Sequence, residues 1–101
     1  MELTVGARLR SAVSDAEVIV IRAQGGAVTV TCGGLPVLSG DDDSPKGEIQ
    51  PGHEGSVVLG KRYVDESDTL ELLCTKPGEG ELAVDGLPLR LKSAKPLPSS
   101  D

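Results

Sequence analysis

The chain has 101 residues, a net charge of −6 and a single aromatic residue, Tyr63. Nucleic-acid binding relies on cationic side chains that neutralise phosphates, and single-strand binding adds aromatic rings for base stacking, so we expect neither nucleic acid nor an anionic membrane surface as a partner. No stretch approaches the roughly 18 apolar residues of a membrane span, and residues 1–3 lead into no signal segment, so we expect a cytoplasmic protein. The length of the chain predicts one domain.

Two strands are predicted at the start of the chain. Residues 2–11 alternate apolar and other side chains, which is the period of a strand with one buried face, and Gly6 marks a bend in it. Residues 17–22 contain four consecutive β-branched side chains, which suit a pleated sheet and crowd a helix. Because this second segment is apolar on both faces, we expect it at the centre of a sheet and covered on both sides.

Two more strands follow at short intervals. Glycines within residues 24–26 supply the positive φ of a tight hairpin, which leads into residues 28–32. A second reversal precedes a short strand over residues 35–38. Pro36 removes a backbone donor from that strand, so we expect the strand at a sheet edge.

Residues 39–56 differ in composition from the rest of the chain. They are rich in Gly, Pro and charged residues, and Ile49 is their one large apolar side chain. Such a segment cannot contribute much to a core. We therefore predict an exposed connector over residues 39–56.

The remainder of the chain repeats the plan of the first part. Four strands are predicted, at residues 57–64, 69–75, 81–84 and 87–91. Pro77 and Gly78 have the residue types of a type II turn. Leu87, Leu89 and Leu91 alternate with polar residues or Pro, so we expect them on one buried face. The tail over residues 93–101 is predicted to be extended and flexible.

An internal repeat organises these strands. Gly34-Leu35-Pro36 recurs as Gly86-Leu87-Pro88 at an offset of 52 (86 − 34), and the same offset aligns Val18 with Leu70. Nearer the N-terminus the offset becomes 54 and aligns Arg8 with Arg62. One structural unit used twice cannot bury its apolar face alone, so the two copies should close on each other.

The sequence therefore predicts an all-β fold, a single small barrel or sandwich built from two four-stranded repeats that are related by a pseudo-two-fold axis. The domain spans residues 1–92. We name residues 1–38 unit one, residues 39–56 the connector and residues 57–92 unit two.

Cys32, Cys74 and His53 are the residues with the chemistry for a metal, redox or catalytic site. Each Cys continues a row of inward aliphatic side chains, which favours two buried free thiols. A disulfide or a metal site that also uses His53 is the alternative, and an enzyme with a Cys nucleophile is a further one. No Cys-x-x-Cys motif is present, and His53 lies between Gly-containing turns, so we expect no cofactor and no enzymatic activity.

Basic side chains gather on the first strand of each unit. Arg8, Arg10, Lys61 and Arg62, with Tyr63 beside them, are the candidate binding residues, because the two-fold relation would bring these strands together. Such a patch would take a carboxylate, a phosphate or an acidic surface of a protein. Ion pairs with nearby acidic residues are the alternative interpretation; these residues are Asp15, Glu17, Asp65 and Glu66.

Several motifs carry a resemblance to a known family. They are Gly6-x-Arg8-Leu9-Arg10, Cys32-Gly33-Gly34-x-Pro36, Gly60-Lys61-Arg62-Tyr63, Leu73 to Gly78 and the tail Lys95 to Asp101. Together they resemble a small uncharacterised actinobacterial protein family of unknown function. The resemblance implies no activity, ligand or catalytic residue.

A non-enzymatic accessory or scaffold module is the function that these features favour. The aliphatic core and the Pro-containing edge strand in each unit predict binding of a protein partner, or of a second copy, through strand edges. The alternative is a small-ligand or metal-binding protein that uses Cys32, Cys74 and His53.

Overall fold

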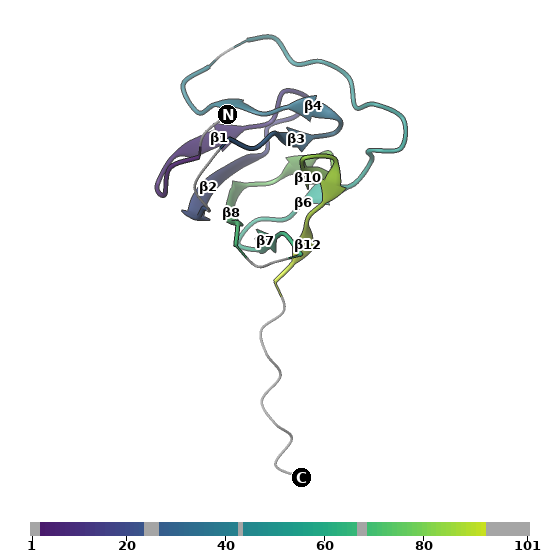
Figure 1. Ribbon diagram of the computed structural model, residues 1–101. Coiled ribbons are helices and arrows are strands. Elements are labelled where there is room, and N and C mark those ends of the chain that lie inside the picture. Colours follow the sequence, from purple (N-terminus) through teal and green to yellow (C-terminus); the bar gives the residue numbers. More distant parts are fainter. Residues whose placement is uncertain (1–2, 24–26, 43, 67–68, 93–101) are drawn as a thin grey trace.

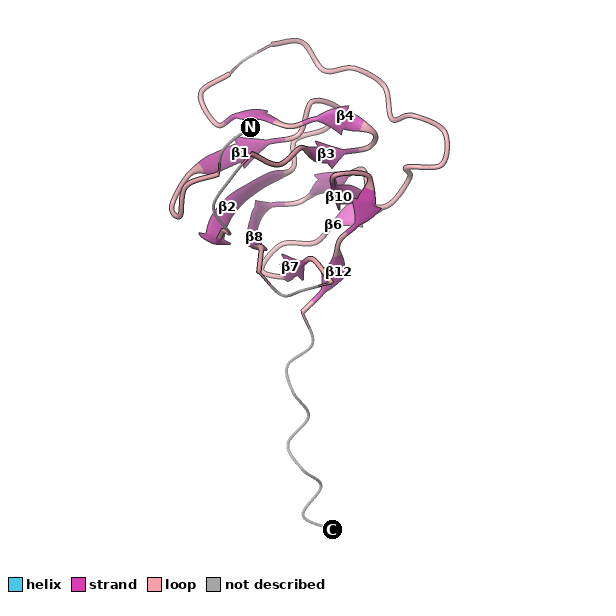
Figure 2. Ribbon diagram, in the orientation of Figure 1, coloured by secondary structure: helices cyan, strands magenta, loops and turns pink. Residues whose placement is uncertain are grey.

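A computed structural model describes residues 3–23, 27–42, 44–66 and 69–92. Within these ranges the chain consists of β-strands joined by turns and loops, without a helix (Figure 1, Figure 2). The all-β prediction is confirmed. The predicted reversal at residues 24–26 and the predicted flexible tail at residues 93–101 lie outside the described residues.

The strands are short, two to six residues each, and turns that contain glycine separate many of them. They are β1 (Arg8–Arg10), β2 (Glu17–Arg22), β3 (Val30–Cys32), β4 (Leu35–Pro36), β5 (Leu38–Ser39), β6 (Ser56–Val57), β7 (Arg62–Val64), β8 (Glu71–Lys76), β9 (Gly78–Glu79), β10 (Leu82–Val84), β11 (Leu87–Pro88) and β12 (Arg90–Leu91).

The strands form two larger sheets and a small one. The six-stranded sheet has the order β12-β7-β8-β2-β1-β5, the four-stranded sheet β11-β10-β3-β4, and β6 pairs with β9. Each pairing is antiparallel. No sheet closes on itself in the described part of the chain, so the barrel prediction is not met and two packed open sheets describe the architecture.

The chain passes from one large sheet to the other at two corners. Val37 separates β4, in the four-stranded sheet, from β5, in the six-stranded sheet, and Leu89 separates β11 from β12 in the same way. A similar backbone hydrogen bond is made at each corner: Val37 N–H donates to Val30 C=O at 3.0 Å, and Leu89 N–H donates to Leu82 C=O at 2.8 Å. Strands that change sheets in this way join the layers of a sandwich.

A single aliphatic core lies between the two large sheets. It takes Val18, Val20 and Leu72 from the six-stranded sheet and Val30 and Leu82 from the four-stranded sheet. Leu72 is fully buried. The inward rows predicted from the alternation of apolar residues are thus confirmed at the centre of the fold.

The centre of each sheet pairs a unit-one strand with a unit-two strand. In the six-stranded sheet Ile19 lies opposite Leu73, with Val18 opposite Cys74 and Val20 opposite Leu72 on either side. Strands β2 and β8 both have six residues and begin 54 positions apart (71 − 17), so the register matches Val18 to Leu72. The alignment predicted from the sequence, Val18 with Leu70, differs from this register by two residues.

In the four-stranded sheet Thr31 lies opposite Ala83, with Val30 opposite Val84 on one side of this pair and Cys32 opposite Leu82 on the other. Here the strands begin 52 positions apart (82 − 30). The strand order of both large sheets therefore reads the same from either end when each unit-one strand is exchanged for its unit-two counterpart.

Three local predictions were wrong. Leu87 and Leu91 are 58% and 50% exposed rather than buried, because two-residue strands at sheet edges have a neighbour on one side only and the chain changes sheets between them. Gly78 begins β9 instead of completing a turn, and the positive φ occurs at Gly80. Ile21 is 36% exposed, so the outer face of β2 is only partly covered.

The long strands predicted at residues 2–11 and 57–64 are each interrupted. Only residues 8–10 of the first are in β1, and the second is divided between β6 and β7. Gly6 and Gly60 interrupt them with φ of 91° and 79°, values that glycine adopts readily. The predicted bends at these glycines are tight turns.

Candidate functional site

Arg8, Arg10 and Arg62, three of the basic residues predicted as a patch, lie on the outer face of the six-stranded sheet. Arg8 is opposite Ile19, Ile19 is opposite Leu73, and Leu73 is opposite Arg62, so the four residues form one row across β1, β2, β8 and β7. Opposite residues share a face, and three strand spacings place the Cα atoms of Arg8 and Arg62 about 14 Å apart. The two arginines thus share a face without touching.

A buried carboxylate organises the unit-two end of this row. Glu71 accepts a hydrogen bond from Lys92 Nζ at 2.8 Å and one from Arg62 Nη1 at 3.1 Å, and its side chain is only 2% exposed. The hydrogen bond and charge of Lys92 and the charge of Arg62 lower the pKa of Glu71 below its ordinary value, against the opposing effect of burial. Glu71 is therefore an anion that two cations hold beneath them.

Arg90 completes this end of the sheet. It lies opposite Val64, two residues along β7 from Arg62, and therefore shares the outer face with Arg62 and Lys92. Arg90 is exposed. We name Arg62, Arg90 and Lys92, with Glu71 beneath them, the unit-two basic face. Sequence reasoning identified only Arg62 of these four, although an acid at the start of an apolar strand was a signal for a buried ion pair.

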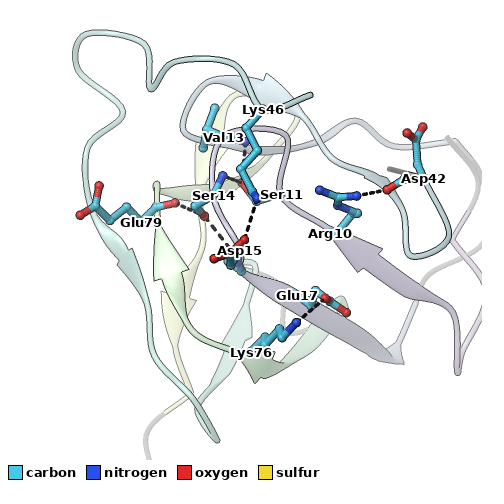
Figure 3. Close-up of polar contacts among 11 residues, drawn as sticks. Arg10, Ser11, Val13, Ser14, Asp15, Glu17, Asp42, Lys46, Lys76 and Glu79 are labelled. Carbon is cyan, nitrogen blue, oxygen red and sulfur yellow. Dashed lines mark hydrogen bonds and ion pairs between the residues drawn. The ribbon is translucent and has the colours of Figure 1, made fainter. Parts of the chain in front are cut away.

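The unit-one end of the row is occupied by the connector. Arg10 donates a hydrogen bond to the main-chain carbonyl of Asp42 (Figure 3). Gly40 N–H donates to Arg8 C=O at 2.9 Å. The pKa of Asp42 is lowered, mainly by hydrogen bonds from Ser44 and also by the charge of Arg10. The acidic run that begins at Asp41 thus follows directly on the strand beside Arg8 and Arg10.

The predicted ion pairs of the basic residues differ from those in the structure. Asp15 pairs with Lys46 at 2.6 Å and Glu17 with Lys76 at 3.5 Å (Figure 3). Asp65 instead accepts hydrogen bonds from the main chain of Thr69 at 2.8 Å and of Leu70 at 3.2 Å, which fix the loop before β8. Glu71, rather than these acids, is the partner of Arg62.

Tyr63 belongs to the core rather than to the outer face. It is 7% exposed, and its hydroxyl accepts a hydrogen bond from Val58 N–H at 2.8 Å and donates to Ser56 C=O at 3.5 Å. These contacts secure the segment that leads from β6 into β7. Lys61 is exposed next to it.

The connector is tied to the domain by main-chain hydrogen bonds. Gly47 N–H donates to Ala12 C=O at 2.7 Å and Gln50 N–H to Gly33 C=O at 2.8 Å. In Figure 1 the connector arches over β4 and descends to β6. A Cβ placed on Gly47 would lie 2.8 Å from Leu35 Cδ1, so the connector main chain rests directly on Leu35.

Cys32 and Cys74 are buried free thiols. Burial raises the pKa of both, and the neighbouring Cys74 raises that of Cys32 further. Cys74 Sγ donates to Lys76 C=O at 3.0 Å, and Cys32 Sγ to Glu79 C=O at 3.8 Å. Thiols in such surroundings are poor nucleophiles at neutral pH.

His53 fastens the end of the connector to unit two. Its Nδ1 lies 3.5 Å from Glu81 Oε1, and its C=O accepts a hydrogen bond from Glu81 N–H at 3.0 Å. Among the described residues, no group of three His, Cys, Asp or Glu side chains is placed to hold a metal ion. Cys32, Cys74 and His53 are therefore not assembled into one site.

The cavity next to Cys32 is small. It is lined mainly by aliphatic side chains of both sheets, together with Arg10, Ser11 and Cys32, and has room for about one water molecule. An organic ligand does not fit there. In the described part of the chain, no helix has the length and hydropathy to cross a membrane.

No protein-family model, curated protein or solved structure matches this chain. The resemblance to a small actinobacterial family remains a prediction. The outer face of the six-stranded sheet and the edge strands beside it are thus judged on their geometry alone.

Proposed function

We propose that the protein is a non-enzymatic accessory or scaffold module that binds a protein partner, or a second copy, through the edge strands of unit two. One observation carries this proposal: Leu87 on β11 is 58% exposed, and Leu91 on β12 is 50% exposed. Exposed apolar side chains on short edge strands are suited to contact with another chain.

The proposal includes a pseudo-two-fold axis that relates unit one to unit two. The reciprocal pairing about Ile19 and Leu73, and about Thr31 and Ala83, supports this axis. Hydrogen bonds outside the strands support it as well. Gly6 N–H donates to Val20 C=O at 2.8 Å, and its counterpart Gly60 N–H donates to Cys74 C=O at 3.0 Å.

Under this relation Leu35 of unit one corresponds to Leu87 of unit two. Leu35 is half-buried beneath the connector at Gly47, whereas Leu87 is exposed. The same edge is thus covered in one unit and open in the other. An open edge in a cytoplasmic protein is a site for association unless charge or proline blocks it, and Pro88 blocks only one position.

The surroundings of the reactive side chains support a non-enzymatic role. Buried thiols with raised pKa values and a histidine held against Glu81 do not form a nucleophile and base within hydrogen-bond reach. We propose that Cys32 and Cys74 serve as core residues.

Site-specific photo-crosslinking in the organism that produces the chain tests this function. A photoreactive residue at Leu87 or Leu91 should form one adduct with a partner or a second copy, and sedimentation of the pure protein separates these two cases. The same residue at Val5, which is 63% exposed on unit one, is the control and should give none. Equal yields at all three positions, or no adduct at Leu87 and Leu91, would contradict the proposal.

A further inference from the structure

We propose that the unit-two basic face binds an extended acidic segment of a partner protein, in the manner in which unit one receives the acidic start of its own connector. This inference rests on the proposed function and specifies the partner's chemistry. Its components are the charge of the face, the arrangement in unit one and Leu91, which is exposed at the same sheet edge but lies opposite Tyr63.

The charge of the face is opposite to that of the whole chain. Arg62, Arg90 and Lys92 contribute three positive charges, and Glu71 contributes one buried negative charge. The face therefore has an excess of about two positive charges in a chain with a net charge of −6. Arg62 and Lys92 remain 53% and 37% exposed while they contact Glu71, so both can accept a second anion.

Unit one shows how an acidic segment lies beside such residues. Gly40 N–H donates to Arg8 C=O where the chain leaves β5 for the acidic run. Arg10 then donates to the main-chain carbonyl of Asp42, and its charge also helps to lower the pKa of the Asp42 carboxyl. Under the proposed two-fold relation the matching bond in unit two is Lys92 N–H to Arg62 C=O at 2.8 Å. Residues 93–101, which follow Lys92, contain one acid and one Lys, so they do not supply an acidic run.

The spacing of the cations defines the segment that fits. Arg90 is in β12 and Lys92 directly follows this strand, and an extended chain repeats its side-chain direction every two residues, about 7 Å. An extended peptide with carboxylates at positions i and i+2 presents them at the same spacing. Leu91, between these two residues, lies opposite Tyr63 and therefore points to the other face of the sheet, where the residue between the two carboxylates of an added edge strand would cover it.

The chain itself supplies a defined probe, the synthetic peptide SGDDDSPKGEIQ, which is residues 39–50. Titration of this peptide into the full-length, ¹⁵N-labelled protein should shift the amide resonances of residues 62 and 87–92, and added salt should weaken the binding. A peptide with Asn in place of each Asp should bind about tenfold more weakly, because its carboxylates are gone.

Two variants locate the binding. Arg90→Glu should weaken the peptide about tenfold, whereas Arg8→Glu, at the counterpart of Arg62 on unit one, should leave the affinity within about twofold. Circular dichroism and thermal melting confirm that both variants are folded. Equal losses in both variants, or no shift at residues 87–92 with millimolar peptide, would overturn the inference.

Two further outcomes of these experiments distinguish this inference from the proposed function. Shifts at residues 87–92 that grow with protein concentration without peptide would mean that a second copy occupies the face, and the acidic-segment inference would be wrong. Crosslinks from Leu87 in cells, together with no peptide binding, would overturn this inference alone and leave the proposed function standing.

Discussion

Unit one and unit two have the same order of strands but different surroundings at their outer edges. In unit one the connector covers Leu35 and receives a hydrogen bond from Arg10. In unit two Leu87 is exposed, and Arg62 and Lys92 surround the buried Glu71 instead of a covering segment. The sheets therefore supply the framework in both halves, and the connector between them determines which half keeps an exposed sheet edge.

The largest expected effect concerns what the units share, the paired strands at the centre. Leu72→Ala should lower the free energy of unfolding by about 2–5 kcal/mol, because Leu72 is fully buried and leaves a cavity. Val18→Ala, at the position that the proposed two-fold relation matches to Leu72, removes fewer carbon atoms and should have a smaller effect of the same sign. Urea denaturation of both variants measures the difference. A larger loss for Val18→Ala would contradict the matched packing.

A close contact between the units should be nearly as sensitive. A Cβ at Gly78 would lie 2.5 Å from Ala16 N and 2.6 Å from Ser14 Oγ, so Gly78→Ala should destabilise the fold by about 1–3 kcal/mol. Gly55→Ala is the matched control, because its Cβ would meet only Glu81 at an ordinary 3.5 Å. Thermal melting should show a drop for the first and little change for the second; equal melting temperatures would contradict the predicted contact.

The carboxylates Glu71 and Glu17 sharpen the difference between the units. Glu71→Gln leaves Arg62 and Lys92 without their anion and should destabilise by about 1–2 kcal/mol at pH 7. Glu17 is the first residue of β2, as Glu71 is of β8, but its side chain is 29% exposed and its partner Lys76 is 62% exposed. Because solvent screens such an ion pair, Glu17→Gln should change stability by less than about 0.5 kcal/mol.

The pH dependence has a definite sign. Because the folded-state pKa of Glu71 is lowered, its contribution is present above the ordinary glutamate pKa and is lost as the pH falls through the folded-state value. The difference between the wild type and Glu71→Gln should therefore shrink in acid. Denaturant titrations at pH 7 and at pH 3 measure this, and a difference that grows in acid would contradict the assignment.

The smallest effects on stability should separate the covered edge from the open one. Leu87→Ser replaces a side chain that is already 58% exposed and should change stability by less than about 0.5 kcal/mol. Leu35→Ser removes an apolar contact beneath the connector and should have an effect of about 1 kcal/mol or more. Similar losses in both variants would mean that the two edges are equally covered.

The centre of this fold could be predicted from the sequence because its signals are side chains. The β-branched run at residues 17–22 and the alternation at residues 28–32 give β2 and β3 their buried rows. The sheet change at Leu89 could not be predicted in this way, since its alternating pattern also suits a continuous strand. Main-chain bonds such as Gln50 N–H to Gly33 C=O use groups that every residue type except proline provides, so they leave no signal in the sequence.

The candidate site was predicted only in part for a related reason. The sequence predicts that Arg8 and Arg62 are equivalent positions, but their separation depends on the two strands that lie between them. Lys92 and Glu71 are 21 positions apart and meet only because β12 pairs with β7 and β7 pairs with β8. Composition and spacing along the chain do not report such a contact.

The most direct test of the proposed two-fold relation is a backbone NOE spectrum of the isotopically labelled protein. It should show contacts between Ile19 and Leu73 and between Thr31 and Ala83, the two positions where the units meet at the centres of the sheets. Contacts that instead pair β2 with β3, or β8 with β10, as separate hairpins within each unit would contradict it.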